Sequence, residues 1–239
     1  MDITPDSVVY WQSGALKINA TLVFTWAVMA LLVGGSWLVT RRLTTETSLP
    51  RAQNLLESIV EGIQGQIRDV TQQDPGRYLP FIGTLFLFIA VSNVLSIVPG
   101  FKPPTGSLST TAALALAVFV AVPIYGIAAQ GLKGYLKTYI RPSVFMLPMN
   151  ILGELTRTIA LAIRLFGNIM SGTMIAAILL SIAPFFFPIL MNALGLLIGL
   201  IQAYIFSILA LVFIASATRA HEEGKPDEAA YAQEETIDG

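Results

Sequence analysis

Residues 151–172 read ILGELTRTIALAIRLFGNIMSG and place an arginine, Arg164, inside strongly apolar sequence. Between residues 158 and 218 the chain has no other Asp, Glu, Lys, Arg or His. A cation at the centre of a membrane segment costs about 2.5–3.5 kcal/mol on insertion scales, and ionisable residues in such segments mark functional sites. We therefore expect Arg164 to serve a function and its counter-charge to come from another chain.

The composition predicts an all-α, polytopic integral membrane protein. Of the 239 residues, 54% are hydrophobic and 12% are charged, against roughly 25% charged in an average soluble domain. The net charge of −1 and the scattered basic residues give no basis for a nucleic-acid partner. The chain has no cysteine and a single histidine, His221, so we expect no thiolate or histidine metal site and no cofactor.

About five membrane helices are predicted from runs long enough to cross an apolar layer of about 30 Å. Arg41 and Arg42 follow the first run, and Lys133, Lys137 and Arg141 share one short loop. Basic loops stay on the cytoplasmic side, which predicts an external N-terminus and a cytoplasmic C-terminus. The single membrane domain then consists of an external segment 1–20, membrane helices 21–40, 78–98, 111–129, 146–183 and 188–218, an amphipathic cytoplasmic-side helix 48–74, and a cytoplasmic tail 219–239.

Three of these segments have special features. Residues 146–183 and 188–218 exceed the roughly 20 residues of a perpendicular span, so they must tilt strongly, lie partly along the bilayer or break; we favour a long, steeply tilted hairpin. Residues 48–74 suit the membrane interface, a partner surface or a solvent-facing linker. Pro123 predicts a kink in its helix.

Polar residues are expected to share faces of the last two helices. At about 100° per residue, Arg157, Arg164, Asn168 and Ser171 form one stripe. On the following helix a second face carries small or amide side chains, which let another helix approach closely. Its members are Asn192, Gly195, Gly199 and Gln202. In the second span, Asn93 fits helix packing better than a channel role.

At these residues the sequence resembles subunit a of F-type ATP synthases. The resemblance rests on Arg164-Leu-Phe-Gly-Asn168 and on Gln202-Ala-Tyr-Ile-Phe206, with further likeness in residues 81–93 and 99–109. It implies an ion-conducting stator subunit of the membrane F0 sector, no enzyme by itself, with two half-channels that couple proton or sodium movement to rotation of the c ring. The implied partners are the c-subunit ring, the subunit b stalk, the remaining F0F1 subunits and the lipid bilayer.

The resemblance also implies roles for particular residues. Arg164 would be the stator arginine that faces each passing c-subunit carboxylate, with Gln202 opposite it. Members of that family usually carry carboxylates where this chain has Thr173 and Ser107, a histidine or glutamate at Gly195, a glutamate at Asn150 and a proline at Thr158. The candidates for the ion path are Gln202, Asn168, Glu154, Asn150, Asn93, Ser171, Thr173 and Ser107.

Glu154 is then the only carboxylate within the predicted spans. Two hypotheses stay open for it: an ion-conducting group, or a structural partner of Arg157 three residues on. A self-contained transporter or channel would need charges paired within one chain, and a membrane scaffold would have no use for Arg164. The expected location is a bacterial plasma membrane, or a thylakoid-type membrane.

Overall fold

The computed structural model describes residues 6, 9–13, 16–41, 51–98, 100–140, 146–182 and 187–219. A short antiparallel hairpin, β1 (Val9–Ser13) and β2 (Leu16–Asn19), leads directly into the first helix. The helices are α1 (Ala20–Thr40), α2 (Arg51–Thr71), α3 (Leu79–Leu95), α4 (Leu108–Ile140), α5 (Met146–Ile182) and α6 (Phe187–Arg219), with short 3-10 turns η2 (Pro75–Arg77) and η3 (Pro104–Gly106). The all-α membrane fold expected from the sequence is confirmed, and the hairpin is an addition to it.

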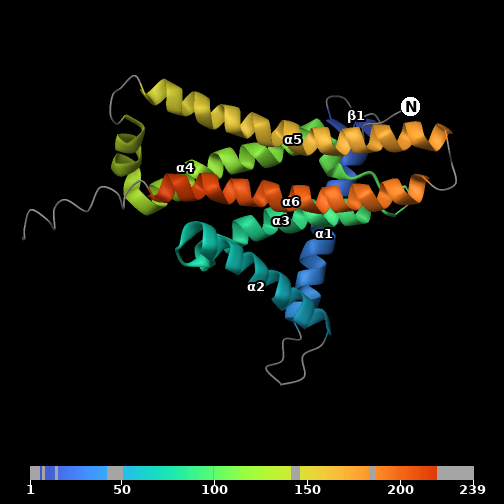
Figure 1. Ribbon diagram of the computed structural model, residues 1–239, viewed down its shortest axis with the longest axis horizontal. Coiled ribbons are helices and arrows are strands. Elements are labelled where there is room, and N and C mark those ends of the chain that lie inside the picture. The colour runs from blue at the N-terminus through green and yellow to red at the C-terminus, as the bar shows by residue number, and fades with distance from the viewer. Residues whose placement is uncertain are drawn as a thin grey trace, which may run out of the picture.

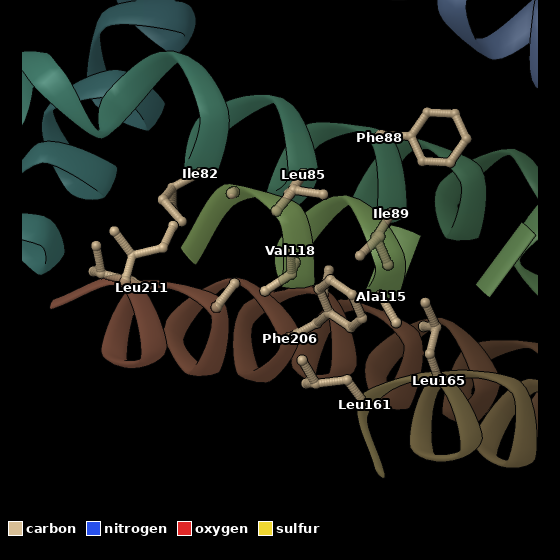
Figure 2. Packing of buried hydrophobic residues seen from close by; sticks show 14 of the residues in the cluster. Ile82, Leu85, Phe88, Ile89, Ala115, Val118, Leu161, Leu165, Phe206 and Leu211 are labelled. Carbon is tan, nitrogen blue, oxygen red and sulfur yellow. The ribbon is translucent and has the colours of Figure 1, made fainter. Parts of the chain in front are cut away.

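Helices α3 to α6 form the body of the molecule and run along its long axis, while α1 and α2 project from one side (Figure 1). Their buried side chains converge in one apolar core, in which Phe206 of α6 and Leu165 of α5 are fully buried (Figure 2). Burying apolar area contributes about 25 cal/mol per Å² in water, but within lipid the gain comes from close packing.

Four helices are long and apolar enough to cross a membrane, and α3, with 17 residues, is a shorter apolar helix. Seventeen residues is the lower limit of a span, so α3 fits the expected total of about five. At 1.5 Å per residue the 37 residues of α5 extend about 55 Å. Because α5 is one continuous helix, it does not break, and the strong tilt or an in-plane portion stays a prediction.

The bend in α4 lies at Gly131 and not at Pro123. Gly131 has φ 74° and ψ 163°, whereas Pro123 sits within helical backbone. Glycine reaches positive φ without steric cost. Past the bend, Tyr135 folds back onto Gly126, where a Cβ would lie 2.5 Å from the tyrosine ring. The kink expected at Pro123 is therefore displaced to a residue that can turn the chain further.

Helix α2 packs its apolar face on the bundle. Ile67 is fully buried, and α2 contacts α3 and α6. The Tyr204 hydroxyl of α6 donates a hydrogen bond of 2.8 Å to Gln66 Oε1. A purely solvent-facing linker is therefore the wrong interpretation of residues 48–74. The predicted tail 219–239, apart from Arg219 at the end of α6, lies outside the described residues, as do residues 183–186 between the last two helices.

Candidate functional site

The position of Arg164 is fixed by the packing of its neighbours on α5. Leu161 and Leu165 are 2% and 0% exposed and anchor one face of the helix in the core. Helical geometry then places Arg164 beside this face, and its side chain is exposed. Among the described residues no carboxylate lies within ion-pair distance of its guanidinium. The structure thus agrees with the sequence in giving Arg164 no counter-charge of its own.

One helical turn further on, Asn168 joins α5 to α6. Its Nδ2 donates a hydrogen bond of 2.7 Å to Gln202 Oε1, so the structure brings together these two candidates from the separate faces predicted for the two helices. Gln202 is 2% exposed, and its Nε2 has no hydrogen-bond partner among the described residues. A buried donor without a partner is rare in native structures. It leaves a polar group for water or for another chain.

Large apolar side chains are exposed on both helices of the hairpin. Ile163 is 58% exposed, Met174 of the same helix 44%, and Ile201 of α6 48%. A soluble protein rarely leaves so many large apolar side chains uncovered, but lipid or a neighbouring membrane helix accommodates them. Arg164 therefore lies on a polar stripe, with exposed Asn168 and Ser171, on a hairpin whose exposed surface also carries large apolar side chains.

Arg157, seven residues before Arg164, has different surroundings. Its guanidinium lies 5.5 Å from the ring centroid of Phe213 on α6, within the range of a cation–π interaction. This contact joins the exposed Arg157 of α5 to α6.

Glu154 and Arg157 both line a small cavity between α4, α5 and α6. Its volume of about 20 Å³ is enough for one water molecule. Glu154 is half-buried, and Asn150, one turn before it, is exposed. At 1.5 Å per residue, Glu154 lies about 15 Å along α5 from Arg164, so this carboxylate is too far along the helix to neutralise the arginine.

Asn93 has a packing role. Its Nδ2 donates a hydrogen bond of 3.0 Å to the Gly199 carbonyl oxygen, and it is 5% exposed. A Cβ on Gly199 would lie 2.7 Å from Asn93 Cγ, so glycine is what lets α3 approach α6. Gly195, on the same predicted face, has nothing within 4 Å of its Cβ position. The two glycines that the sequence grouped together therefore differ in their surroundings.

Ser107 is fully buried at the start of α4 and reaches a carboxylate that sequence reasoning missed. Its Oγ donates a hydrogen bond of 2.6 Å to Asp6 Oδ2. The two residues are 101 positions apart in the chain, and no local pattern connects them. The available signal was the hydroxyl-rich sequence of residues 107–111 together with an acidic residue ahead of the first span.

Ser171 and Thr173 are both exposed on α5 beyond Asn168. Thr173 donates its hydroxyl to the Met170 carbonyl oxygen at 2.9 Å, a bond within its own helix. Neither residue joins the Asn168–Gln202 pair. Among the described residues no group of three or more His, Cys, Asp or Glu side chains could hold a metal ion.

The long α5–α6 hairpin carries the exposed Arg164 and an amide pair that joins its two helices, and these features define a polytopic α-helical membrane protein with a polar site on this hairpin. The model of the family described as ATP synthase A chain matches residues 22–215. The chain belongs to this family.

Curated relatives cover nearly the whole chain. It is 64% identical over 223 residues to ATP synthase subunit a 1 of Chlorobaculum parvum, covering 93% of this chain and 99% of that protein. It is 60% identical over 222 residues to ATP synthase subunit a 2 of Acaryochloris marina, covering 93% and 95%. Over 223 residues it is 57% identical to ATP synthase subunit a of Nitrosospira multiformis, covering 93% and 89%.

Proposed function

We propose that this chain is the ion-conducting stator subunit of a rotary ATP synthase, in which Arg164 faces the ion-binding carboxylate of each passing c subunit. It provides two half-channels, one from each side of the membrane, that couple proton or sodium movement to rotation of the ring. The chain acts as a subunit and not as an enzyme by itself. Its partners are the c ring, the subunit b stalk and the remaining F0F1 subunits.

The observation that carries this proposal is the exposure of Arg164 on the α5–α6 hairpin without a carboxylate from its own chain among the described residues. A guanidinium remains charged in proteins. Its cost within a membrane is offset when a carboxylate of a neighbouring chain lies opposite it. A ring of helices that presents one carboxylate after another fits the long, uninterrupted face of α5.

The chemistry of the arginine follows from electrostatics. A nearby positive charge favours the ionised form of a carboxylate, so a ring carboxylate that arrives opposite Arg164 releases its proton or sodium ion. The same fixed charge repels a cation moving directly from one half-channel to the other. The result is that ions cross the membrane only by travelling with the ring.

The Asn168–Gln202 hydrogen bond would position the groups beside Arg164. It ties α5 to α6 one turn from the arginine, and the partnerless Gln202 Nε2 provides a donor to water in the ion path. Ser171 and Thr173 line the proposed path on one side of this pair. Glu154 and Asn150 line it on the other.

The two half-channels are assigned from the ends of the bundle. Basic residues after α1 and in the last part of α4 indicate the cytoplasmic side, so Glu154 and Asn150 belong to the cytoplasmic path and Ser107 to the external one. Asn93, which joins α3 to α6, supports the wall between them. The complex then lies in a bacterial plasma membrane or a thylakoid-type membrane, with the N-terminus of this chain outside.

The proposal is tested with purified complex reconstituted into liposomes, in which ATP synthesis is driven by an imposed ion gradient. Arg164→Ala is expected to abolish synthesis while the subunit still assembles with the ring. Arg157→Gln is the matched control, because this exposed arginine lies on the same helix but contacts Phe213 of its own chain, and it is expected to retain synthesis. Normal coupled synthesis in Arg164→Ala would overturn the proposal.

A further inference from the structure

The end of the bundle at which α4 begins carries a connected set of four oxygen-bearing side chains. Thr21 Oγ1 donates a hydrogen bond of 2.6 Å to Asp6 Oδ1, and Ser107 Oγ donates one of 2.6 Å to Asp6 Oδ2. The hydroxyls of Ser107 and Ser109 are also 2.6 Å apart. We call Asp6, Thr21, Ser107 and Ser109 the Asp6 cluster.

The direction of hydrogen bonding in this cluster can be worked out. A serine hydroxyl has one proton to donate, and the proton of Ser107 is used on Asp6. Ser109 must therefore donate to Ser107. The chain of donors runs from Ser109, which is exposed, through the fully buried Ser107 to the half-buried Asp6, and it ends on a carboxylate that accepts from both sides.

Two neighbouring oxygens have no hydrogen-bond partner among the described residues. Thr105 Oγ1 is one, in a residue that is 0% exposed, and Asn19 Oδ1 is the other. Each lies two residues before a member of the Asp6 cluster, Ser107 and Thr21. Buried polar atoms without partners in a native structure call for a ligand, water or ion. These two atoms belong to segments that also supply Thr21 and Ser107 to the Asp6 cluster.

Few other charges are present on the elements around this region. The turn η3 contacts α1, α3, α4 and α5. Helices α1 and α3 contain no charged residue, and α4 contains none before Lys133. Lys102 precedes η3, Lys17 lies opposite Gln12 in the backbone register of the β hairpin, and α5 carries Glu154, Arg157 and Arg164. Asp6 is thus the carboxylate that these elements place beside η3.

We infer that Asp6 is the carboxylate that receives the translocated monovalent cation in the external half-channel. The inference rests on the proposed function, since it needs ions to cross at α5, the helix that η3 contacts. If the cation is a proton, Ser109 takes it from hydronium, which becomes water, and passes its own proton to Ser107, which passes its own to Asp6 Oδ2. Each hydroxyl keeps one proton and the carboxylate becomes neutral. If the cation is sodium, the same carboxylate and hydroxyl oxygens are the ligands that a hard cation prefers.

A structural role for Asp6, holding the N-terminal segment to α1 and α4, predicts something different. An asparagine at this position keeps an oxygen acceptor and the same shape but loses the charge. It would preserve much of a structural role and remove the ability to take up a cation. The dependence of flux on the external ion separates the two roles, because a merely structural residue does not set it.

The experiment uses reconstituted complex carrying Asp6→Asn, with ATP synthesis measured against external pH at fixed sodium and against external sodium at fixed pH. The external ion concentration that gives half-maximal synthesis is expected to rise about tenfold, because a positioned proton acceptor contributes 10²-fold or more and water replaces part of it. The dependence on the internal ion is expected to stay unchanged. A shift in the dependence on external pH identifies the cation as a proton, and a shift in the dependence on external sodium identifies it as sodium.

Asp74→Asn is the matched control. Asp74 accepts a hydrogen bond of 3.2 Å from the backbone nitrogen of Gly76 at the turn before α3, away from the Asp6 cluster, and its variant is expected to behave like the unaltered chain. The inference would be overturned if Asp6→Asn left the external ion concentration for half-maximal synthesis unchanged, or if it shifted the internal one instead. If the Asp6→Asn subunit fails to assemble, Ser109→Ala provides the test, because it removes only the exposed hydroxyl at the start of the row of hydrogen-bond donors. If the dependence of synthesis on the external ion is unchanged in Ser109→Ala, the inference is equally overturned.

Arg164→Ala in the same preparation separates this inference from the function it rests on. If Arg164→Ala abolishes synthesis and Asp6→Asn leaves the external dependence unaltered, only the role of Asp6 fails. If Arg164→Ala retains coupled synthesis, the proposed function fails as well.

Discussion

Two regions of the α5–α6 hairpin contain the same kinds of residue with different contacts. In the first, which we call the covered region, Arg157 lies over Phe213 and Gly199 lies against Asn93. In the second, the open region, Arg164 is exposed and Gly195 has nothing within 4 Å of its Cβ position. Residue type alone does not separate these positions. Both arginines are exposed, and the contact with Phe213 distinguishes Arg157, whereas for the glycines the difference is burial of Gly199 against α3.

The largest effect is expected from paired lysine substitutions. Arg164→Lys should lose most coupled ATP synthesis, because a compact ammonium does not reproduce the planar fork that a guanidinium presents to a carboxylate. Arg157→Lys should keep it, because an ammonium over an aromatic ring retains a cation–π interaction. Gradient-driven synthesis in liposomes measures both. Equal losses in the two variants would remove the distinction between the regions.

A smaller effect is expected at Glu154, in the covered region. Glu154→Gln should reduce ion flux about tenfold if this carboxylate transfers the ion, and adding Arg157→Gln should not restore it, because Arg157 contacts Phe213. Flux through reconstituted complex measures both variants. Recovery in the double variant would show that the two residues act as a structural pair.

The sequence predicted α1 and α5 closely because apolar length is a local property: the expected spans 21–40 and 146–183 differ from these helices by one residue at one end. The prediction for α4 was wrong at its end, since the helix continues to Ile140, past residue 129, and includes Lys133 and Lys137, which were expected in a loop. The sequence also predicted that Arg164 has no charged partner within its own apolar segment, because residues 158–218 contain no other charged residue.

Other features depended on distant contacts and were missed or displaced. Asp6 reaches Ser107 across 101 positions, so calling Glu154 the only carboxylate within the spans overlooked an acid supplied from outside them. The bend at Gly131 needs positive φ, which a proline cannot adopt. The β hairpin had a signal that was not used, a Gly14-Ala15 pair between two short runs of strand-forming residues.

The next prediction compares the stability effects of alanine substitutions at the two glycines of α6, Gly199 and Gly195. Gly199→Ala should destabilise the subunit by about 1–3 kcal/mol, because its Cβ would overlap Asn93 and force α3 away from α6. Gly195→Ala should leave stability unchanged or slightly raise it, since alanine favours a helix by about 1 kcal/mol over glycine. Thermal unfolding of the detergent-solubilised complex compares the two. A larger loss at Gly195 would reverse the assignment of covered and open regions.

The most direct test of the central claim, that the open region meets another chain, is disulfide cross-linking. The sequence has no native cysteine, so Ser171→Cys, on the Arg164 stripe, can be paired with single cysteines near the carboxylate of the c subunit. A disulfide forms only when the two Cα atoms are about 4.4–6.8 Å apart. We predict cross-links to the ring from Ser171→Cys and none from Met170→Cys, whose side chain points to a different side of α5. Cross-links from Met170→Cys alone would contradict the claim that the face carrying Arg164 is the one that meets the ring.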